Sequence, residues 1–163
     1  VARHDGSWTR MDKAFKRAEG LLESWMKEHH DKDCYPPTII NITDGEYNGT
    51  SHDEMQQLAN QLKSMFTNDG NVLFFNIHVV PGHAESVVFP ATVDELNGNG
   101  YGDKLYNMSS LLPLNYNEQI RAIFGDKQTD IRYHAMGVNT GMERLVKMMK
   151  IGTLSSMLVN QNL

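Results

Sequence analysis

The sequence predicts an α/β fold of the three-layer, Rossmann-like class, with a mainly parallel sheet and helices on both faces. Three observations support this fold class: two amphipathic helical patterns, two unbroken apolar runs, and the alternation of helix and strand along the chain. Such alternation is typical of a parallel sheet whose crossover helices pack against it.

The helical patterns occupy residues 10–29 and 51–66. In both, apolar residues recur every three or four positions, and charged residues fill the other face of the first. The apolar positions of the first helix are Met11, Ala14, Phe15, Ala18, Leu21, Leu22, Trp25 and Met26. The second pattern follows Ser51, with Glu54 three residues later, which is the spacing of a capping box. We expect this helix to end at Asn68-Asp69-Gly70.

Two apolar runs predict strands at Thr38–Thr43 (TIINIT) and at residues 72–80 (VLFFNIHVV). Both runs are short and rich in β-branched or aromatic residues, and neither alternates between apolar and polar positions. Continuous runs of this kind are typical of parallel strands that are covered on both faces.

The remainder of the chain is less regular. Residues 97–102 (NGNGYG) predict a loop, residues 117–124 a short helix, residues 131–138 a third strand, and residues 140–150 a final helix. We find no internal repeat and no boundary between domains, so we expect residues 1–163 to form one domain.

Composition restricts the function. The chain has 163 residues, with 15 Lys and Arg against 20 Asp and Glu, so its formal charge is −5. This balance gives no basic surface for nucleic acid or for an anionic membrane. Cys34 is the only cysteine, which excludes a cysteine-based zinc site. Because the sequence has neither a spanning apolar segment nor a signal segment, we expect a cytoplasmic protein without membrane insertion.

The segment most informative about function is TIINITDGEYNGT, residues 38–50. A strand that ends in Asp44-Gly45 places a carboxylate at the carboxyl edge of the sheet, where α/β folds bind ligands. Glycine after the aspartate allows the backbone to turn sharply away from the sheet.

Pro36-Pro37, the apolar strand and then Ile-Thr-Asp-Gly-Glu resemble the von Willebrand factor type A (VWA) domain family. In that family this strand supplies an aspartate of the metal-ion-dependent adhesion site (MIDAS), and an earlier loop supplies a threonine. Thr9, within Gly6-Ser7-Trp8-Thr9, lies 35 positions before Asp44, and this order fits the family. The resemblance therefore implies that Thr9 and Asp44 are metal ligands.

The implied cation is Mg²⁺, with Ca²⁺ or Mn²⁺ as alternatives, because hard cations prefer hydroxyl and carboxylate oxygens. An acidic side chain of a partner protein would complete its coordination. The resemblance thus implies a protein-binding module rather than an enzyme.

The chain departs from the family in one element. The family carries Asp-x-Ser-x-Ser after its first, central strand, and no strand here ends in that motif. Asp5-Gly6-Ser7-Trp8-Thr9 has similar spacing, but only four residues precede it. We therefore expect the domain to be N-terminally incomplete, with the alternative that this segment is the primary motif. Without the first strands, Thr38–Thr43 would form an exposed apolar edge, which predicts self-association or pairing with a separate N-terminal segment.

Two other functions remain open. One is a structural VWA-like domain with a degenerate metal site. The other is a Rossmann-like, metal-dependent phosphatase or hydrolase, because Ile-Thr-Asp-Gly also resembles haloacid dehalogenase strands. Those enzymes carry a nucleophilic aspartate two positions before the aspartate of Asp-Gly, and Ile42 occupies that position.

The histidines favour structural roles. His29-His30 at a helix end suits capping, and His134 on the third strand suits a hydrogen-bonded core position. His78 lies on the second strand and His83 follows the Pro-Gly turn after it, so the two could converge at the carboxyl edge of the sheet.

Three methionines and the single cysteine are also expected to have packing roles. Met142, Met148 and Met149 follow helical spacing and are expected in the core. Cys34 is expected to be a buried or half-buried thiol.

Overall fold

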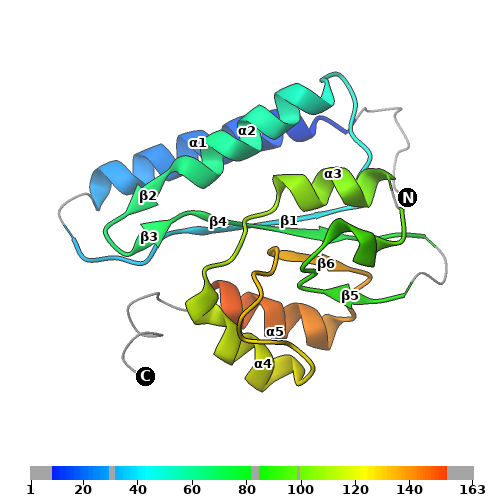
Figure 1. Cartoon of the computed structure of the whole chain (residues 1–163). Coiled ribbons are helices and arrows are strands. Elements are labelled where there is room, and N and C mark those ends of the chain that lie inside the picture. Colours follow the sequence, from blue (N-terminus) through cyan, green and yellow to red (C-terminus); the bar gives the residue numbers. More distant parts are fainter. Residues whose placement is uncertain (1–8, 30–31, 82–84, 99, 154–163) are drawn as a thin grey trace.

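A computed structural model describes residues 9–29, 32–81, 85–98 and 100–153, and these form three layers (Figure 1). The helices are α1 (Met11–Glu28), α2 (His52–Ser64), α3 (Gly100–Met108), α4 (Asn117–Phe124) and α5 (Met142–Gly152), with 3-10 turns at Val93–Leu96 and Leu114–Tyr116. The strands are β1 (Thr38–Thr43), β2 (Phe66–Thr67), β3 (Gly70–Asn71), β4 (Leu73–His78), β5 (Val87–Val88) and β6 (Met136–Val138). The expected α/β class and the mainly parallel sheet are confirmed.

The main sheet has the strand order β1-β4-β6-β5. β1 pairs in parallel with β4, β4 in parallel with β6, and the short β5 pairs antiparallel with β6. β2 and β3 form a separate two-stranded hairpin. Among the described residues, no strand pairs with the other edge of β1, so β1 is an edge strand of this sheet.

Helices α1, α2 and α3 cover one face of the sheet, which we call the α1 face (Figure 1). Phe15 of α1 meets Phe74 of β4 edge to face, with ring centroids 5.0 Å apart. The buried residues of this face include Met11, Leu22, Met55, Ala59, Leu62, Leu105, Met108 and Met136. Burial of these side chains holds three helices on one face without any disulfide.

Helices α4 and α5 cover the opposite face, which we call the α5 face (Figure 1). Its buried residues include Leu73, Phe75, Ile77, Phe89, Leu112, Tyr116, Ile120 and Met148. Gly152 lets the end of α5 approach the sheet closely, because a Cβ there would lie 2.9 Å from the Phe75 ring. Thr38, the first residue of β1, donates a hydrogen bond to the Gly152 carbonyl.

A buried polar network crosses the α1 face. The Asn76 side chain accepts a hydrogen bond from Asn41 at 2.8 Å and donates to Ser109 Oγ and the Leu105 carbonyl. Asn76 is fully buried, so each of these bonds offsets a desolvation cost. The network fixes β1, β4 and the end of α3 relative to one another.

Several element boundaries differ from expectation. α2 ends at Ser64 rather than at Asn68-Asp69-Gly70, because the chain turns into the β2–β3 hairpin, where Phe66 is exposed. The third strand is only Met136–Val138, and the final helix begins at Met142. The expected helices 10–29 and 117–124 are confirmed within a residue or two.

Two predictions are wrong. Residues 100–102 do not form a loop, because they begin α3, in which Gly102 and Leu105 are buried. Met142 and Met149 are not core residues, since they are 74% and 43% exposed, whereas Met148 is buried as expected. No helix in the described part of the chain combines the length and the apolar character needed to span a membrane.

Candidate functional site

The turn after β1 is built by its own side chains. The Asp44 Oδ1 atom accepts a hydrogen bond from the Glu46 N–H at 3.1 Å, and the Thr43 hydroxyl accepts one from the Gly45 N–H at 3.0 Å. Such short-range bonds give the backbone a defined turn. Asp44 is exposed, as expected for a residue at the carboxyl edge of the sheet.

Gly45 is required at this turn for two reasons. Its φ is +89°, which residues with a Cβ rarely adopt. A Cβ at this position would also lie 2.6 Å from the Cβ of Tyr101 and 2.9 Å from Cε1 of His78. The role predicted for the glycine after Asp44 is therefore confirmed, and the contact with α3 adds a constraint that the sequence did not reveal.

The structure brings Thr9 to the same loop. The Thr9 carbonyl accepts a hydrogen bond from the Asn48 N–H at 2.9 Å, four residues after Asp44. Thr9 is exposed, and its hydroxyl has no hydrogen-bond partner among the described residues. The two predicted metal ligands thus belong to adjoining segments at the carboxyl edge. Coordination of one cation by both side chains stays a prediction.

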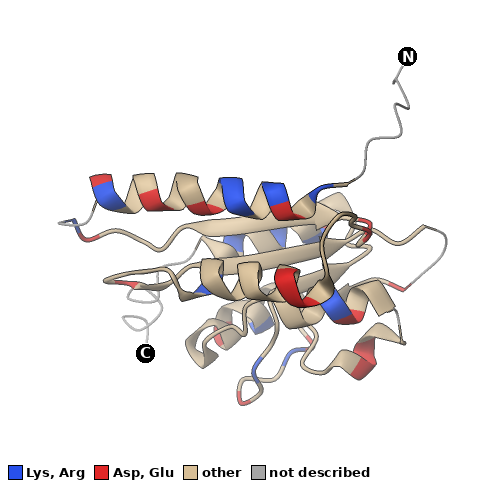
Figure 2. Ribbon diagram, turned by 90° about the horizontal axis from the view of Figure 1, so that it is seen from above, with Lys and Arg blue, Asp and Glu red and all other residues tan. Residues whose placement is uncertain are grey.

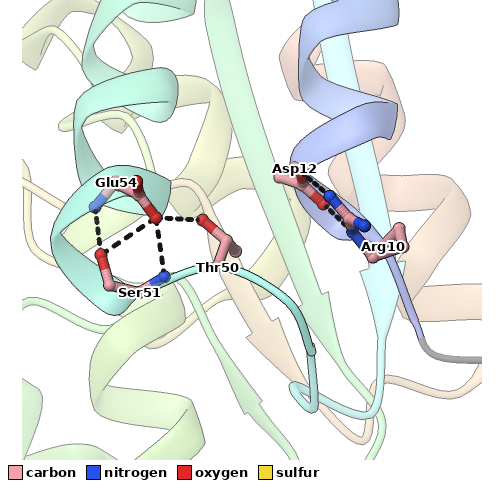
Figure 3. Close-up of polar contacts among 5 residues, drawn as sticks. All are labelled: Arg10, Asp12, Thr50, Ser51 and Glu54. Carbon is pink, nitrogen blue, oxygen red and sulfur yellow. Dashed lines mark hydrogen bonds and ion pairs between the residues drawn. The ribbon is translucent and has the colours of Figure 1, made fainter.

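An ion pair lies beside this loop at the start of α1 (Figure 3). The Arg10 guanidinium donates two hydrogen bonds to the Asp12 carboxylate, at 2.9 Å and 2.7 Å. These bonds lower the pKa of Asp12 to about 2. The Asp12 carboxylate is therefore ionised, and both of its oxygens are bonded to Arg10 rather than available to a metal ion.

The loop is fixed at its other end by the start of α2 (Figure 3). Glu54 accepts hydrogen bonds from the Ser51 N–H and the Thr50 hydroxyl, and the Ser51 hydroxyl accepts one from the Glu54 N–H. The predicted capping box is confirmed. The same bonds, first of all that from the Ser51 backbone, lower the pKa of Glu54.

Aromatic and cationic side chains lie around Asp44-Gly45, and the sequence did not identify them. Lys104 Nζ lies 5.2 Å from the ring centroid of Tyr101 and 5.9 Å from that of Tyr47. The Tyr47 hydroxyl bonds to Nδ1 of His52 at 3.0 Å. The helical spacing of Tyr101, Leu105 and Met108 was the signal that could have located α3 and this cluster.

The described histidines have structural contacts. His29 Nδ1 lies 2.7 Å from the Trp25 carbonyl and its ring stacks on Trp25, as expected for a helix end. His78 is buried beside Thr43. His134 stacks on Tyr106 and bonds to its carbonyl, although it precedes β6. His30 and His83 lie outside the described residues.

Cys34 is half-buried, as expected. Asp5, Gly6, Ser7 and Trp8 of the alternative primary motif lie outside the described residues.

Thr9 and Asp44 offer the kind of oxygen atom that Mg²⁺ binds, but too few of them to fill its coordination sphere. A hydroxyl and a carboxylate are oxygen ligands, and Mg²⁺ is often held by one or two carboxylates with several waters. One Asp44 oxygen already accepts the Glu46 N–H. No group of three or more His, Cys, Asp or Glu suited to a metal occurs within the described ranges. These two residues alone would hold a weakly bound, largely hydrated ion.

Comparisons of the chain with protein-family models, with curated proteins and with solved structures give no match.

Proposed function

We propose that this chain is a protein-binding module of VWA-like architecture, whose binding surface is the carboxyl edge of the sheet around Asp44. The observation that carries the proposal is the exposed Asp44 carboxylate, held at the end of β1 in a loop that is hydrogen-bonded to Thr9. Polar groups at the carboxyl ends of parallel strands are the usual ligand-binding groups of α/β folds.

The surroundings of Asp44 support protein binding. Tyr101 is exposed, and Tyr47 and Lys104 are half-buried beside it. Tyrosine supplies a large contact area at a low entropy cost and is enriched in binding surfaces. The loop is fixed at both ends, by the Thr9–Asn48 bond and the capping box, so little further ordering is needed when a partner binds.

The proposal includes a divalent cation, Mg²⁺ first, held by Asp44 and Thr9 with water in the remaining positions. The ion would supply a positive site for an acidic side chain of the partner. Ile42 occupies the position at which similar phosphatases carry their nucleophile, so the phosphatase alternative has less support.

Titration with Mg²⁺ alone, followed by amide chemical shifts, tests the proposal. We expect shifts confined to residues near 9–10 and 44–48, and we expect Asp44→Asn and Thr9→Val to abolish or weaken them. Asp126→Asn removes an exposed carboxylate elsewhere on the chain and should leave the shifts unchanged.

A degenerate site is the competing interpretation, favoured by the engagement of one Asp44 oxygen and of Asp12 within the fold. If millimolar Mg²⁺ shifts no resonance near Asp44, or if Asp44→Asn responds like the unmodified chain, the metal proposal is wrong.

A further inference from the structure

The outer edge of β1 displays backbone groups in a regular pattern. The Pro37 carbonyl accepts a hydrogen bond from Leu73 of β4, and the Thr43 carbonyl accepts one from Val79, directly after β4. Because backbone groups alternate along a strand, Ile39 and Asn41 also direct theirs to β4, while Thr38, Ile40 and Ile42 direct theirs outward. No described strand pairs with this edge.

The edge carries none of the features that normally prevent strand pairing. β1 has no charged residue, no proline and no glycine within Thr38–Thr43. Edge strands of monomeric proteins usually carry charges, prolines or bulges for this purpose. Ile42, on the α5 face, is 57% exposed.

On the α1 face, an apolar groove of about 580 Å³ runs beside this edge. It is lined by Ala18, Leu21, Leu22 and Trp25 of α1 together with Pro37 and Ile39. Leu21 is 61% exposed, so part of the apolar stripe of α1 is accessible to a partner. Charged residues of both signs occur along α1 (Figure 2), and none of them lines the groove.

On the α5 face, the exposed residues Met142, Val146 and Met149 form a stripe. Arg144 lies on the other flank of α5, since a helix turns 100° per residue, and it donates to Ser86 beside β5. Val146 lies about 160° around α5 from the buried Met148, so this stripe faces largely away from the sheet.

We propose that the β1 edge binds a second copy of the chain, by antiparallel pairing of β1 with β1 of the partner about a two-fold axis at Ile40. This register pairs Thr38 with the partner's Ile42 and Ile40 with the partner's Ile40. All three outward residues of each copy then exchange hydrogen bonds. The main sheet becomes continuous across the two copies.

A second copy is favoured over other occupants because it complements the β1 edge and the α1 groove at once. A two-fold axis perpendicular to the sheet places strand against strand and the α1 groove against the α1 groove. The groove and the strand contain no charged residue, so two chains of charge −5 do not repel each other there. A lipid surface would leave the strand's donors and acceptors unsatisfied.

Sedimentation of residues 1–163 over roughly 1 to 100 µM tests the inference, because dimerisation follows mass action. We expect a reversible monomer–dimer equilibrium. Ile42→Lys and Leu21→Lys place charges on the strand and in the α1 groove, and each should weaken dimerisation by about tenfold or more. Leu114→Lys changes a comparably exposed residue elsewhere and should not. Circular dichroism shows whether each variant remains folded.

A chain that stays monomeric throughout this range overturns the inference and indicates that another segment covers β1. A dimer that is unaffected by both charged variants also overturns it, since the contact must then lie elsewhere. The inference does not use Thr9 or Asp44, so its failure leaves the proposed function intact, and the reverse also holds.

Discussion

β1 and β4 are neighbouring strands of equal length and similar composition, yet their environments are opposite. Every residue of β4 is buried, whereas the residues of β1 are half-buried or exposed. The backbone of β4 bonds on both sides: toward β1, and toward Ser110, Ala135 and Asn139 on the other. β1 bonds on one side only among the described residues.

The difference shows what an apolar run specifies. An uncharged, β-branched sequence predicts a strand that belongs inside a sheet, and both runs carry this pattern. Whether the strand is covered depends on which other segments reach it. The pattern of β1 predicts a strand inside a sheet, but only β4 pairs with it among the described residues. Its other edge is therefore exposed.

The largest expected difference between the strands comes from one matched pair of substitutions. Ile42 and Ile77 are register partners, but Ile42 is 57% exposed and Ile77 only 3%. Ile77→Ala should lower the free energy of unfolding by about 2–5 kcal/mol. Ile42→Ala should lower it by less than about 1 kcal/mol. Denaturant unfolding at low micromolar concentration measures both, and equal losses would show that β1 is covered.

The turn after β1, where Gly45 packs against Tyr101 of α3, offers a second test. Gly45→Ala must adopt φ +89° and must displace Tyr101 or His78, whereas Gly98→Ala adopts φ +71° in open space. The left-handed conformation alone costs about 1–2 kcal/mol, so Gly98→Ala isolates that cost. We expect Gly45→Ala to destabilise the fold by clearly more than Gly98→Ala in thermal unfolding. Similar losses would mean that the contact with α3 is loose.

The smallest expected effect is a change of the free energy of unfolding with pH, caused by His134, which precedes β6. Burial lowers the pKa of His134, nearby Lys63 lowers it further, and the hydrogen bond to the Tyr106 carbonyl acts in the opposite direction. The unfolded chain therefore binds a proton at higher pH than the folded chain does. The stabilisation from neutral His134 is complete above pH of about 6.5 and is lost as pH falls through that value.

Unfolding of the wild type and of His134→Gln, at a series of pH values from about 7.5 down to about 5, measures this contribution. We expect the wild type to lose more stability than the variant over this interval. A wild type whose stability changes no more than that of the variant would contradict the assignment.

Local patterns predicted much of the fold. Helices α1 and α4 and the start of α2 follow from periodicity and from the capping box at Ser51 and Glu54. α3 was missed because Gly100 and Gly102 resemble a loop, although Gly102 is buried. The β2–β3 hairpin interrupts a helical pattern that Met65 and Phe66 continue in the sequence. These errors arise where tertiary contacts override local preference.

The candidate site was predicted in part. The sequence placed Asp44 at a strand end and predicted the turn at Gly45, and both are confirmed. The proximity of the Thr9 backbone to the Asp44 loop fits the predicted pairing. Tyr101 and Lys104 were missed because they reach the loop from α3, about 60 positions later in the chain, and spacing alone does not report such contacts.

Residue-resolved hydrogen exchange of β1, read by mass spectrometry at about 1 µM, tests the edge-strand account most directly. The account predicts alternation: slow exchange for Ile39, Asn41 and Thr43, whose amides face β4, and fast exchange for Thr38, Ile40 and Ile42. Both sets of β4 amides should exchange slowly. Uniformly slow exchange along β1 at this dilution would contradict the account, because it would mean that a further strand already covers the edge.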